Sequence, residues 1–251
     1  MNIHSYFDRI RYEGSFQPAF ETLDKLHTAH MFAVPFENLD IPLHRRIILD
    51  ESSLFNKIVT RRRGGFCYEL NGLFAALLRD LGFNVTMLAA GVARERGGFG
   101  PEFDHMALIV TLGSRWLVDV GFGDSFLTPL LLDDESEQKQ DSGIFKTIRN
   151  GKYHVLLRNN KTNGWAPQYR FTLEPRQLND YNEQCRWHQT SPGSSFTQKR
   201  VCSLPTNEGR ITLSDSMLIT TTHDGSRQKN NISTPEEYLS ILREKFGIIL
   251  Y

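Results

Sequence analysis

The chain of 251 residues is long enough for one large domain, or for two to three small ones, with a substantial core. Lysine plus arginine equals aspartate plus glutamate, at 29 residues each, so no net charge favours binding to nucleic acid or to an anionic membrane.

The three cysteines, Cys67, Cys185 and Cys202, are odd in number and widely spaced. This pattern predicts neither a disulfide framework nor a metal site. The N-terminal residues lack the apolar core of a signal peptide, and no apolar run is long enough to span a bilayer. We therefore expect a metal-free protein of the reducing cytoplasm, without membrane contact, as a monomer or weak homo-oligomer.

Residues 1–83 are predicted to be mostly helical. Pro18 can open one helix, and Asp50 can cap a second, shorter one. His27 and His30 lie one helical turn apart on the first of these helices. Because no third ligand is apparent nearby, we expect the two histidines to be core or surface residues rather than metal ligands.

The most informative stretch of this region is 62–71, with the sequence RRGGFCYELN. Apolar residues recur at helical spacing from Phe66 until Gly82, which predicts an amphipathic helix with Cys67 in its first turn. Free N–H groups and the helix dipole would lower the pKa of the Cys67 thiol there and make it a nucleophile. On this stretch alone, an inert buried cysteine is an equally good interpretation.

From Asn84 the apolar period changes to two, which predicts a barrel or sandwich of short strands. Asn150-Gly151 is a strong hairpin signal between two of them, and 234–237 is a capping box that predicts a C-terminal helix. The predicted strands are 84–92, 105–112, 115–120, 144–149, 152–158, 168–173, 195–204, 210–213 and 217–222.

His105 and Asp119 lie in two consecutive apolar strands. A hairpin centred on Gly113 would place His105 opposite Gly121 and diagonal to Asp119 on the same face. A carboxylate in a β core is costly unless it is paired, so the histidine is its natural partner. The pair could orient the imidazole toward Cys67 in a nucleophile–base–orienter triad. The alternative is a structural pair unrelated to Cys67, since spacing alone cannot bring the helix to the hairpin; the triad is favoured because an ionisable pair in apolar strands needs a reason.

Five ordered motifs resemble those of the arylamine N-acetyltransferases. The stretch 62–71 is similar to that family's nucleophile signature. One matching motif precedes it and the others come after it, in the family's order. The further matching stretches are 34–39 (VPFENL), 104–105 (DH), 118–123 (VDVGFG), and 191–197 with 202–206 (SPGSSFT, CSLPT).

The resemblance implies an α+β fold with a cysteine-protease-like Cys-His-Asp core. It would comprise an N-terminal helical bundle over residues 1–83, a central β-barrel over 84–190 and a short α/β lid over 191–251. Within this fold, Cys67 would be the acetyl-accepting nucleophile, His105 the base and Asp119 the orienting residue.

The resemblance also implies acetyl-CoA as the donor and an aromatic amine, hydrazine or N-hydroxyarylamine as the acceptor. Transfer would follow a ping-pong mechanism through an acetyl-cysteine intermediate. The resemblance also implies a role in xenobiotic metabolism. Phe36 and Phe122 would line the acceptor pocket, and Phe103 and Asp104 would contact the donor. Two other functional classes remain open: a cysteine hydrolase, either amidase or peptidase, with the same triad, and a non-catalytic binding protein.

Overall fold

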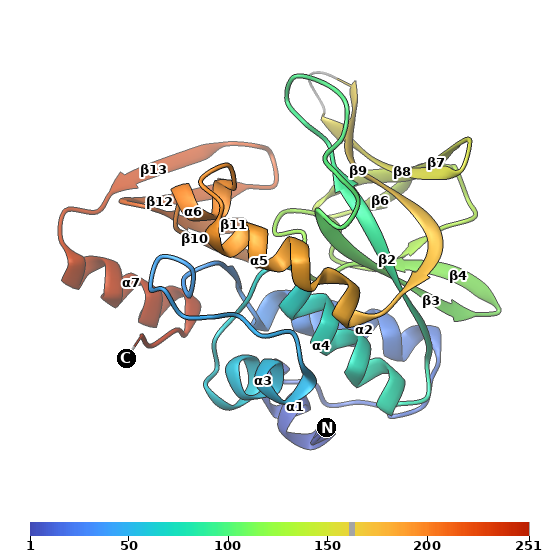
Figure 1. Ribbon diagram of the computed structural model, residues 1–251, viewed down its shortest axis with the longest axis horizontal. Helices are drawn as coiled ribbons and strands as arrows, with labels where there is room; N and C mark the ends of the chain where they lie inside the picture. Colours follow the sequence, from blue (N-terminus) through green and yellow to red (C-terminus); the bar gives the residue numbers. More distant parts are fainter. Residues whose placement is uncertain (161–163, 251) are drawn as a thin grey trace.

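Two antiparallel sheets and a group of N-terminal helices make up an α+β fold (Figure 1). The structure is a computed structural model that describes residues 1–160 and 164–250. The predicted fold class is confirmed by the helices and by an eight-stranded sheet that curves into a nearly closed barrel. The division at residues 83 and 190 stays a prediction, and Tyr251, the end of its last part, lies outside the described residues.

All the N-terminal helices contribute apolar side chains to one large core cluster, and α4 contributes more of them than any other helix. The Asp50 carboxylate caps α3 by accepting the Ser53 N–H at 2.9 Å, and Gly82, with φ of 87°, follows the end of α4. Both ends agree with the sequence prediction. The helices are α1 (Ile3–Ile10), α2 (Phe20–Ala33), α3 (Glu51–Phe55) with its π-helical continuation η1 (Asn56–Thr60), and α4 (Cys67–Asp80).

The larger sheet has the strand order β5-β4-β3-β2-β9-β8-β7-β6, with every neighbouring pair antiparallel. Its two edge strands are joined by the Gln138 side chain of β6, which accepts the Leu131 N–H of β5 and donates to the Leu131 carbonyl. The strands are β2 (Asn84–Val92), β3 (His105–Leu112), β4 (Ser114–Val118), β5 (Leu130–Leu131), β6 (Gln138–Gln140), β7 (Gly143–Asn150), β8 (Tyr153–Asn160) and β9 (Gly164–Arg176).

Two local predictions are wrong. Asn150 pairs with Tyr153, so the two-residue loop of the β7–β8 hairpin is Gly151-Lys152 rather than Asn150-Gly151. The predicted strand 195–204 is split into the short helix α6 (Ser195–Gln198) and β10 (Val201–Thr206). The Ser194 hydroxyl accepts the Phe196 N–H and so begins a helical turn where alternation alone suggested a strand.

The smaller sheet combines β1 (Phe36–Glu37) with four strands from the end of the chain, in the order β1-β10-β11-β12-β13. Phe36 pairs with Ser203 of β10, so the N-terminal region supplies an edge strand to the C-terminal one. The Thr234 hydroxyl caps α7 (Pro235–Phe246), as predicted. The remaining strands are β11 (Gly209–Ser214), β12 (Met217–Thr222) and β13 (Arg227–Asn231).

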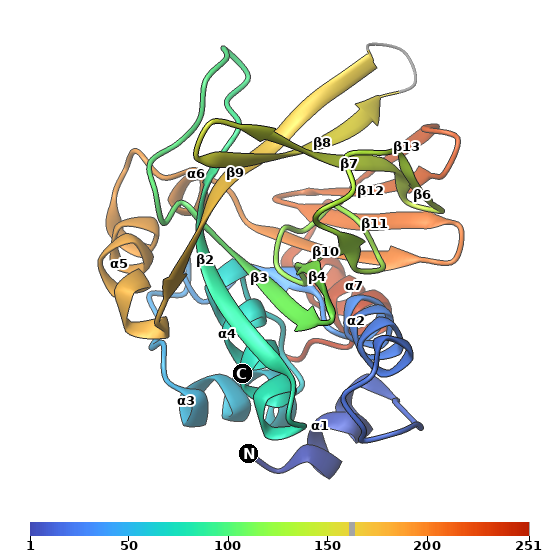
Figure 2. The same ribbon diagram turned by 90° about the vertical axis from the view of Figure 1, so that its right-hand side faces the viewer.

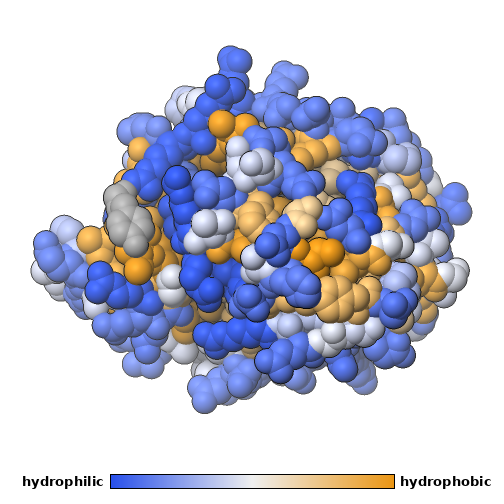
Figure 3. Space-filling view, turned by 90° about the horizontal axis from the view of Figure 1, so that it is seen from below, coloured by the Kyte–Doolittle hydropathy of each residue, from blue (hydrophilic) through white to orange (hydrophobic). Residues whose placement is uncertain are grey.

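Strands β2 and β3 of the barrel lie directly against α4, and this contact positions the site described below (Figures 1 and 2). A segment that the sequence did not predict as helical, η2 (Leu178–Tyr181) and α5 (Asn182–Thr190), connects β9 to α6. The face seen from below is mostly polar, with apolar side chains in smaller areas (Figure 3). Among the described residues, every helix is too short or too polar to cross a bilayer.

Candidate active site

Cys67 is the first residue of α4, directly after the N-cap residue Phe66. Two close approaches shape the loop before it. A Cβ on Gly64 would collide with the Pro35 carbonyl oxygen, and one on Gly65 would come within 2.8 Å of the Glu69 side chain. The two glycines are therefore required by packing, and they place Cys67 in the first turn, as the sequence predicts.

His105 and Asp119 form the hydrogen-bonded pair that the hairpin register predicts. Leu108 pairs with Val118 across the turn at Gly113, and His105 Nε2 lies 2.7 Å from Asp119 Oδ2. His105 is 2 % exposed and Asp119 is fully buried. Burial alone would raise the pKa of Asp119, but the imidazole and hydrogen bonds to the carboxylate outweigh burial and lower it. The carboxylate is thus ionised and accepts the Nε2 proton.

Asn71, one helical turn after Cys67, ties α4 to this pair, and sequence reasoning missed it. Its side-chain N–H groups reach the Met106 carbonyl at 2.7 Å and Asp119 Oδ1 at 2.8 Å. The side-chain oxygen of Asn71, Oδ1, accepts the Val120 N–H at 2.9 Å. Its position four residues after a candidate nucleophile, on the same face of a predicted helix, was the signal in the sequence that could have identified it.

Cys67 lies against the segment that follows His105 and against the segment that follows Asp119. The Met106 backbone acts on its sulfur in the direction that favours the thiolate, and a Cβ on Gly121 would lie 2.8 Å from its Cα. These contacts bring Cys67 next to residues that adjoin His105 and Asp119. Because Nε2 is bound to Asp119, Nδ1 is the ring nitrogen that remains for the sulfur.

The pKa of Cys67 does not move in the expected direction. The side chain is 4 % exposed, and burial raises the pKa of its thiol well above the ordinary value. The Met106 backbone lowers the pKa of the thiol but does not offset burial. The prediction of a lowered pKa from the helix dipole alone is therefore wrong, and a thiolate at this position needs a cation beside it.

His27 supports Asp119 from behind. Its Nδ1 lies 2.8 Å from the Leu127 carbonyl, to which it must donate, and its Nε2 accepts the Asp119 N–H at 3.3 Å. Burial lowers the pKa of His27 to about 4, so the ring is neutral, as these contacts require. His30 is also buried and shares a hydrogen bond with Tyr6, so both histidines are core residues.

Phe36 and Phe122 are half-buried. The Phe122 ring packs 5.1 Å from the His105 ring and 5.1 Å from that of Tyr169, which the sequence did not single out. A Cβ on Gly123 would lie 3.5 Å from the Phe36 ring. Phe122 therefore lies against the imidazole, and Phe36 lies against the residue that follows Phe122; that the two rings line a pocket stays a prediction.

Phe103 and Asp104 are bound into the loop before β3. The Tyr68 hydroxyl donates to the Phe103 carbonyl, and Asp104 Oδ1 lies 3.5 Å from His188 Nε2 on α5. Gly100 packs directly on the Asp104 carboxylate. Their contact with a donor stays a prediction. Among the described residues, no group of three histidine, cysteine or acidic side chains is placed to hold a metal ion.

Comparison with known proteins gives a consistent result over nearly the whole chain. A family model described as N-acetyltransferase matches residues 19–251. An arylamine N-acetyltransferase / N-hydroxyarylamine O-acetyltransferase of Salmonella typhimurium is 36% identical, over 98% of this chain and 88% of the relative.

Solved structures agree with these sequence matches. An arylamine N-acetyltransferase from Salmonella typhimurium superposes with a TM-score of 0.93 at 32% identity, covering 98% of this chain and 90% of the other. A Mycobacterium marinum arylamine N-acetyltransferase in complex with CoA superposes with a TM-score of 0.91 at 30% identity, covering 98% and 93%.

Proposed function

The chain belongs to the arylamine N-acetyltransferase family and is an acyltransferase, and on this basis we propose that it acetylates aromatic amines, hydrazines or N-hydroxyarylamines through an acetyl-Cys67 intermediate. The donor in this proposal is acetyl-CoA. The relative from Mycobacterium marinum with bound CoA supports this donor. The observation that carries the mechanism is the His105–Asp119 hydrogen bond beside the first turn of α4.

The first half-reaction starts with proton transfer from the Cys67 thiol to His105 Nδ1. The imidazolium that forms is held between the sulfur and the Asp119 carboxylate, so both new charges are paired inside a buried site. The sulfur then attacks the acetyl carbonyl of acetyl-CoA. The Cys67 backbone N–H, at the positive end of α4, is the donor we assign to the oxyanion. CoA leaves as its thiol after taking the proton from His105.

In the second half-reaction the amine nitrogen attacks the acetyl thioester on Cys67. His105 accepts a proton from the amine as the C–N bond forms, and the Cys67 sulfur leaves as the C–S bond breaks. Both half-reactions use the same base and nucleophile, so ping-pong kinetics are expected. In this proposal Phe36 and Phe122 bound the space for the aromatic ring and keep water from the thioester. Phe103 and Asp104 contact the donor.

The test is the mass of the protein after treatment with acetyl-CoA in the absence of an acceptor. One acetyl group on Cys67, discharged by an arylamine, is the expected result. Cys67→Ala should abolish labelling, whereas Cys202→Ala, in the core of the smaller sheet, is the matched control and should label normally. Release of CoA at the same rate without any amine would instead identify a hydrolase and overturn the proposal.

A further inference from the structure

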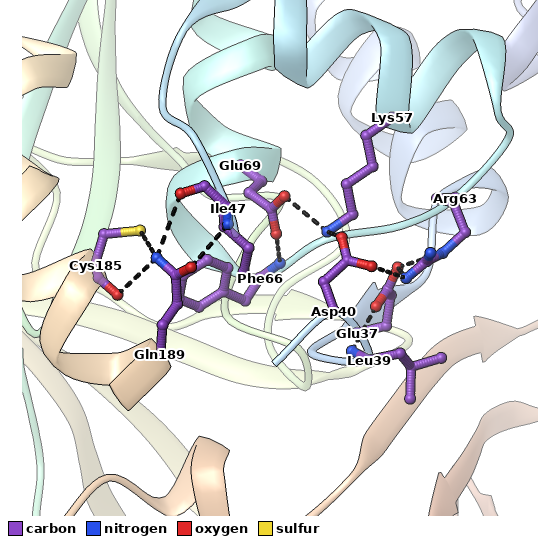
Figure 4. Close-up of polar contacts among 10 residues, drawn as sticks. All are labelled: Glu37, Leu39, Asp40, Ile47, Lys57, Arg63, Phe66, Glu69, Cys185 and Gln189. Atoms are coloured by element: carbon purple, nitrogen blue, oxygen red, sulfur yellow. Dashed lines mark hydrogen bonds and ion pairs between the residues drawn. The ribbon is translucent and has the colours of Figure 1, made fainter. Parts of the chain in front are cut away.

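A second buried polar group lies behind the first turn of α4 (Figure 4). Glu69 comes two residues after Cys67 and two before Asn71, so it projects from the opposite side of the helix. Three carboxylates meet two cations there, and none of the five is an exposed residue. We call this group the ion cluster, and it consists of Glu37, Asp40, Lys57, Arg63 and Glu69.

The two cations divide the carboxylates between them. Arg63 lies 2.8 Å from Glu37 Oε1 and 3.1 Å from Asp40 Oδ1. Lys57 Nζ bridges Asp40 Oδ2 and Glu69 Oε1, each at 2.8 Å (Figure 4). Lys57 is thus the cation in direct contact with Glu69.

Glu69 connects the ion cluster to the nucleophile. Its Oε2 accepts the Phe66 N–H at 3.1 Å, and Phe66 is the residue directly before Cys67. The backbone at Gly65 packs against the same carboxylate, so close that a Cβ would lie 2.9 Å from Oε2. The position of this carboxylate therefore sets the path of the loop that presents Cys67.

The charge of Glu69 depends on its neighbours. Burial raises the pKa of Glu69 to about 7, although the Lys57 ammonium and the Phe66 N–H act to lower it. Burial would lower the pKa of Lys57, but its acidic neighbours outweigh burial and raise it. Lys57 therefore stays charged at neutral pH. The titratable groups that face Glu69 are Lys57 on η1, Glu37 on β1 and the Cys185 thiol on α5.

We propose that Lys57 is a positioning residue for acetyl transfer: its ammonium holds the Glu69 carboxylate and favours the ionised form, so that Glu69 holds the Phe66 N–H and the turn that presents Cys67 to His105. The inference rests on the proposed function in taking Cys67 as the nucleophile. Without Lys57, a buried carboxylate without its cation takes up a proton, and the hydrogen bond that orders the turn weakens.

The experiment measures alkylation of Cys67 by iodoacetamide as a function of pH, and in parallel its acetylation by acetyl-CoA. Lys57→Met should slow both reactions at pH 7 by roughly tenfold or more, because a small displacement misaligns sulfur and imidazole. The pH at which the rate falls on the acid side of the profile should also rise by about one unit. Glu69 then lacks the neighbouring ammonium that favours its ionised form. Lys25→Met, on the exposed side of α2, is the matched control.

Two further variants separate positioning from loss of packing. Lys57→Arg keeps the charge and should recover most of the rate. Lys57→Met/Glu69→Gln removes the carboxylate that needs a cation, while the amide oxygen can still accept the Phe66 N–H. This double variant should therefore react faster than Lys57→Met and lack the upward shift of the acid limb. If Lys57→Met alone fails to fold, the double variant is compared with Glu69→Gln, and equal rates are expected because Lys57 then has no Glu69 carboxylate to hold; a slower double variant would overturn the proposal.

The role of Lys57 is overturned if Lys57→Met matches the Lys25→Met control, or if the double variant is as slow as Lys57→Met. Failure of acetyl-CoA to label the wild-type protein, with the alkylation differences intact, would reject the acetyl-transfer proposal and retain the positioning role of Lys57. If the alkylation differences disappear while acetyl-CoA still labels the wild-type protein, the positioning role of Lys57 is rejected and the acetyl-transfer proposal is retained.

Discussion

The first turn of α4 lies between two buried ionic groups that differ in one chemical property. On the barrel side, Asp119 faces an imidazole, whose charge changes when a proton moves. On the opposite side, the carboxylates of the ion cluster face Lys57 and Arg63, which stay charged at neutral pH. The comparison suggests a division of labour: one group exchanges protons with the nucleophile, and the other holds the nucleophile's backbone in place.

The strongest way to break this comparison is Asp119→Asn. The carbonyl oxygen of the introduced amide would take the place of Oδ1 and accept from Asn71 and Gly121, so the amide NH₂ group would face His105 Nε2. That contact forces the imidazole proton onto Nδ1. With Nδ1 protonated, the ring can no longer accept the thiol proton. We expect kcat to fall by roughly 10⁴-fold, as for removal of a triad carboxylate. Wild-type turnover would show that Asp119 does not orient the base.

Asn71→Ala tests whether the two sides are mechanically linked through α4. The change leaves the Met106 carbonyl and the Val120 N–H without their partner inside the core. Each buried unsatisfied group costs about 1–3 kcal/mol. We expect both a lower midpoint in urea unfolding and a slower acetylation of Cys67, measured on the folded protein. A loss of stability with unchanged acetylation would make Asn71 purely structural.

Glu69→Gln sharpens the comparison through the pH dependence of stability. The pKa of Glu69 is raised to about 7 in the fold, above its unfolded value, so its contribution to stability is fully present below the unfolded pKa. It is lost as pH rises through about 7. The difference between the folded and unfolded pKa values corresponds to about 3 kcal/mol.

Glutamine does not titrate, so the variant should gain stability relative to wild type between about pH 4.5 and 7.5. Urea unfolding at pH 5 and pH 7.5 measures this gain directly. An equal difference at the two pH values would mean that Glu69 does not titrate in this range. Asp40 in the ion cluster and Asp119 on the barrel side have lowered pKa values, and their contribution to stability is lost only as pH falls further.

The smallest effect is expected at an exposed pair that serves as a reference for both buried groups. Arg115 and Asp133 form an ion pair at the surface, with side chains 40% and 47% exposed. Arg115→Gln should change the free energy of unfolding by less than about 1 kcal/mol. Thermal unfolding at low and high salt measures it. A loss as large as that of a buried pair would contradict the distinction drawn here between buried and exposed charges.

Features that depend on neighbours along the chain follow from the order of the amino acids. Cys67 begins a helix because two glycines precede a run of apolar residues with helical spacing. His105 and Asp119 meet because the turn at Gly113 sets the register of one hairpin. The loop of the hairpin at Gly151 lies one residue further along the chain than predicted, because the turn signal does not specify which residue pair closes the loop.

The charges and the partners of these residues depend instead on how the elements pack together. The pKa of Cys67 is raised because the barrel buries its sulfur, which the helix position alone does not indicate. Lys57, Asn71 and Glu69 acquire their roles from residues on other elements, and no spacing rule connects such contacts. Burial and long-range pairing are properties of the packed chain, since each depends on all the elements that close around a residue.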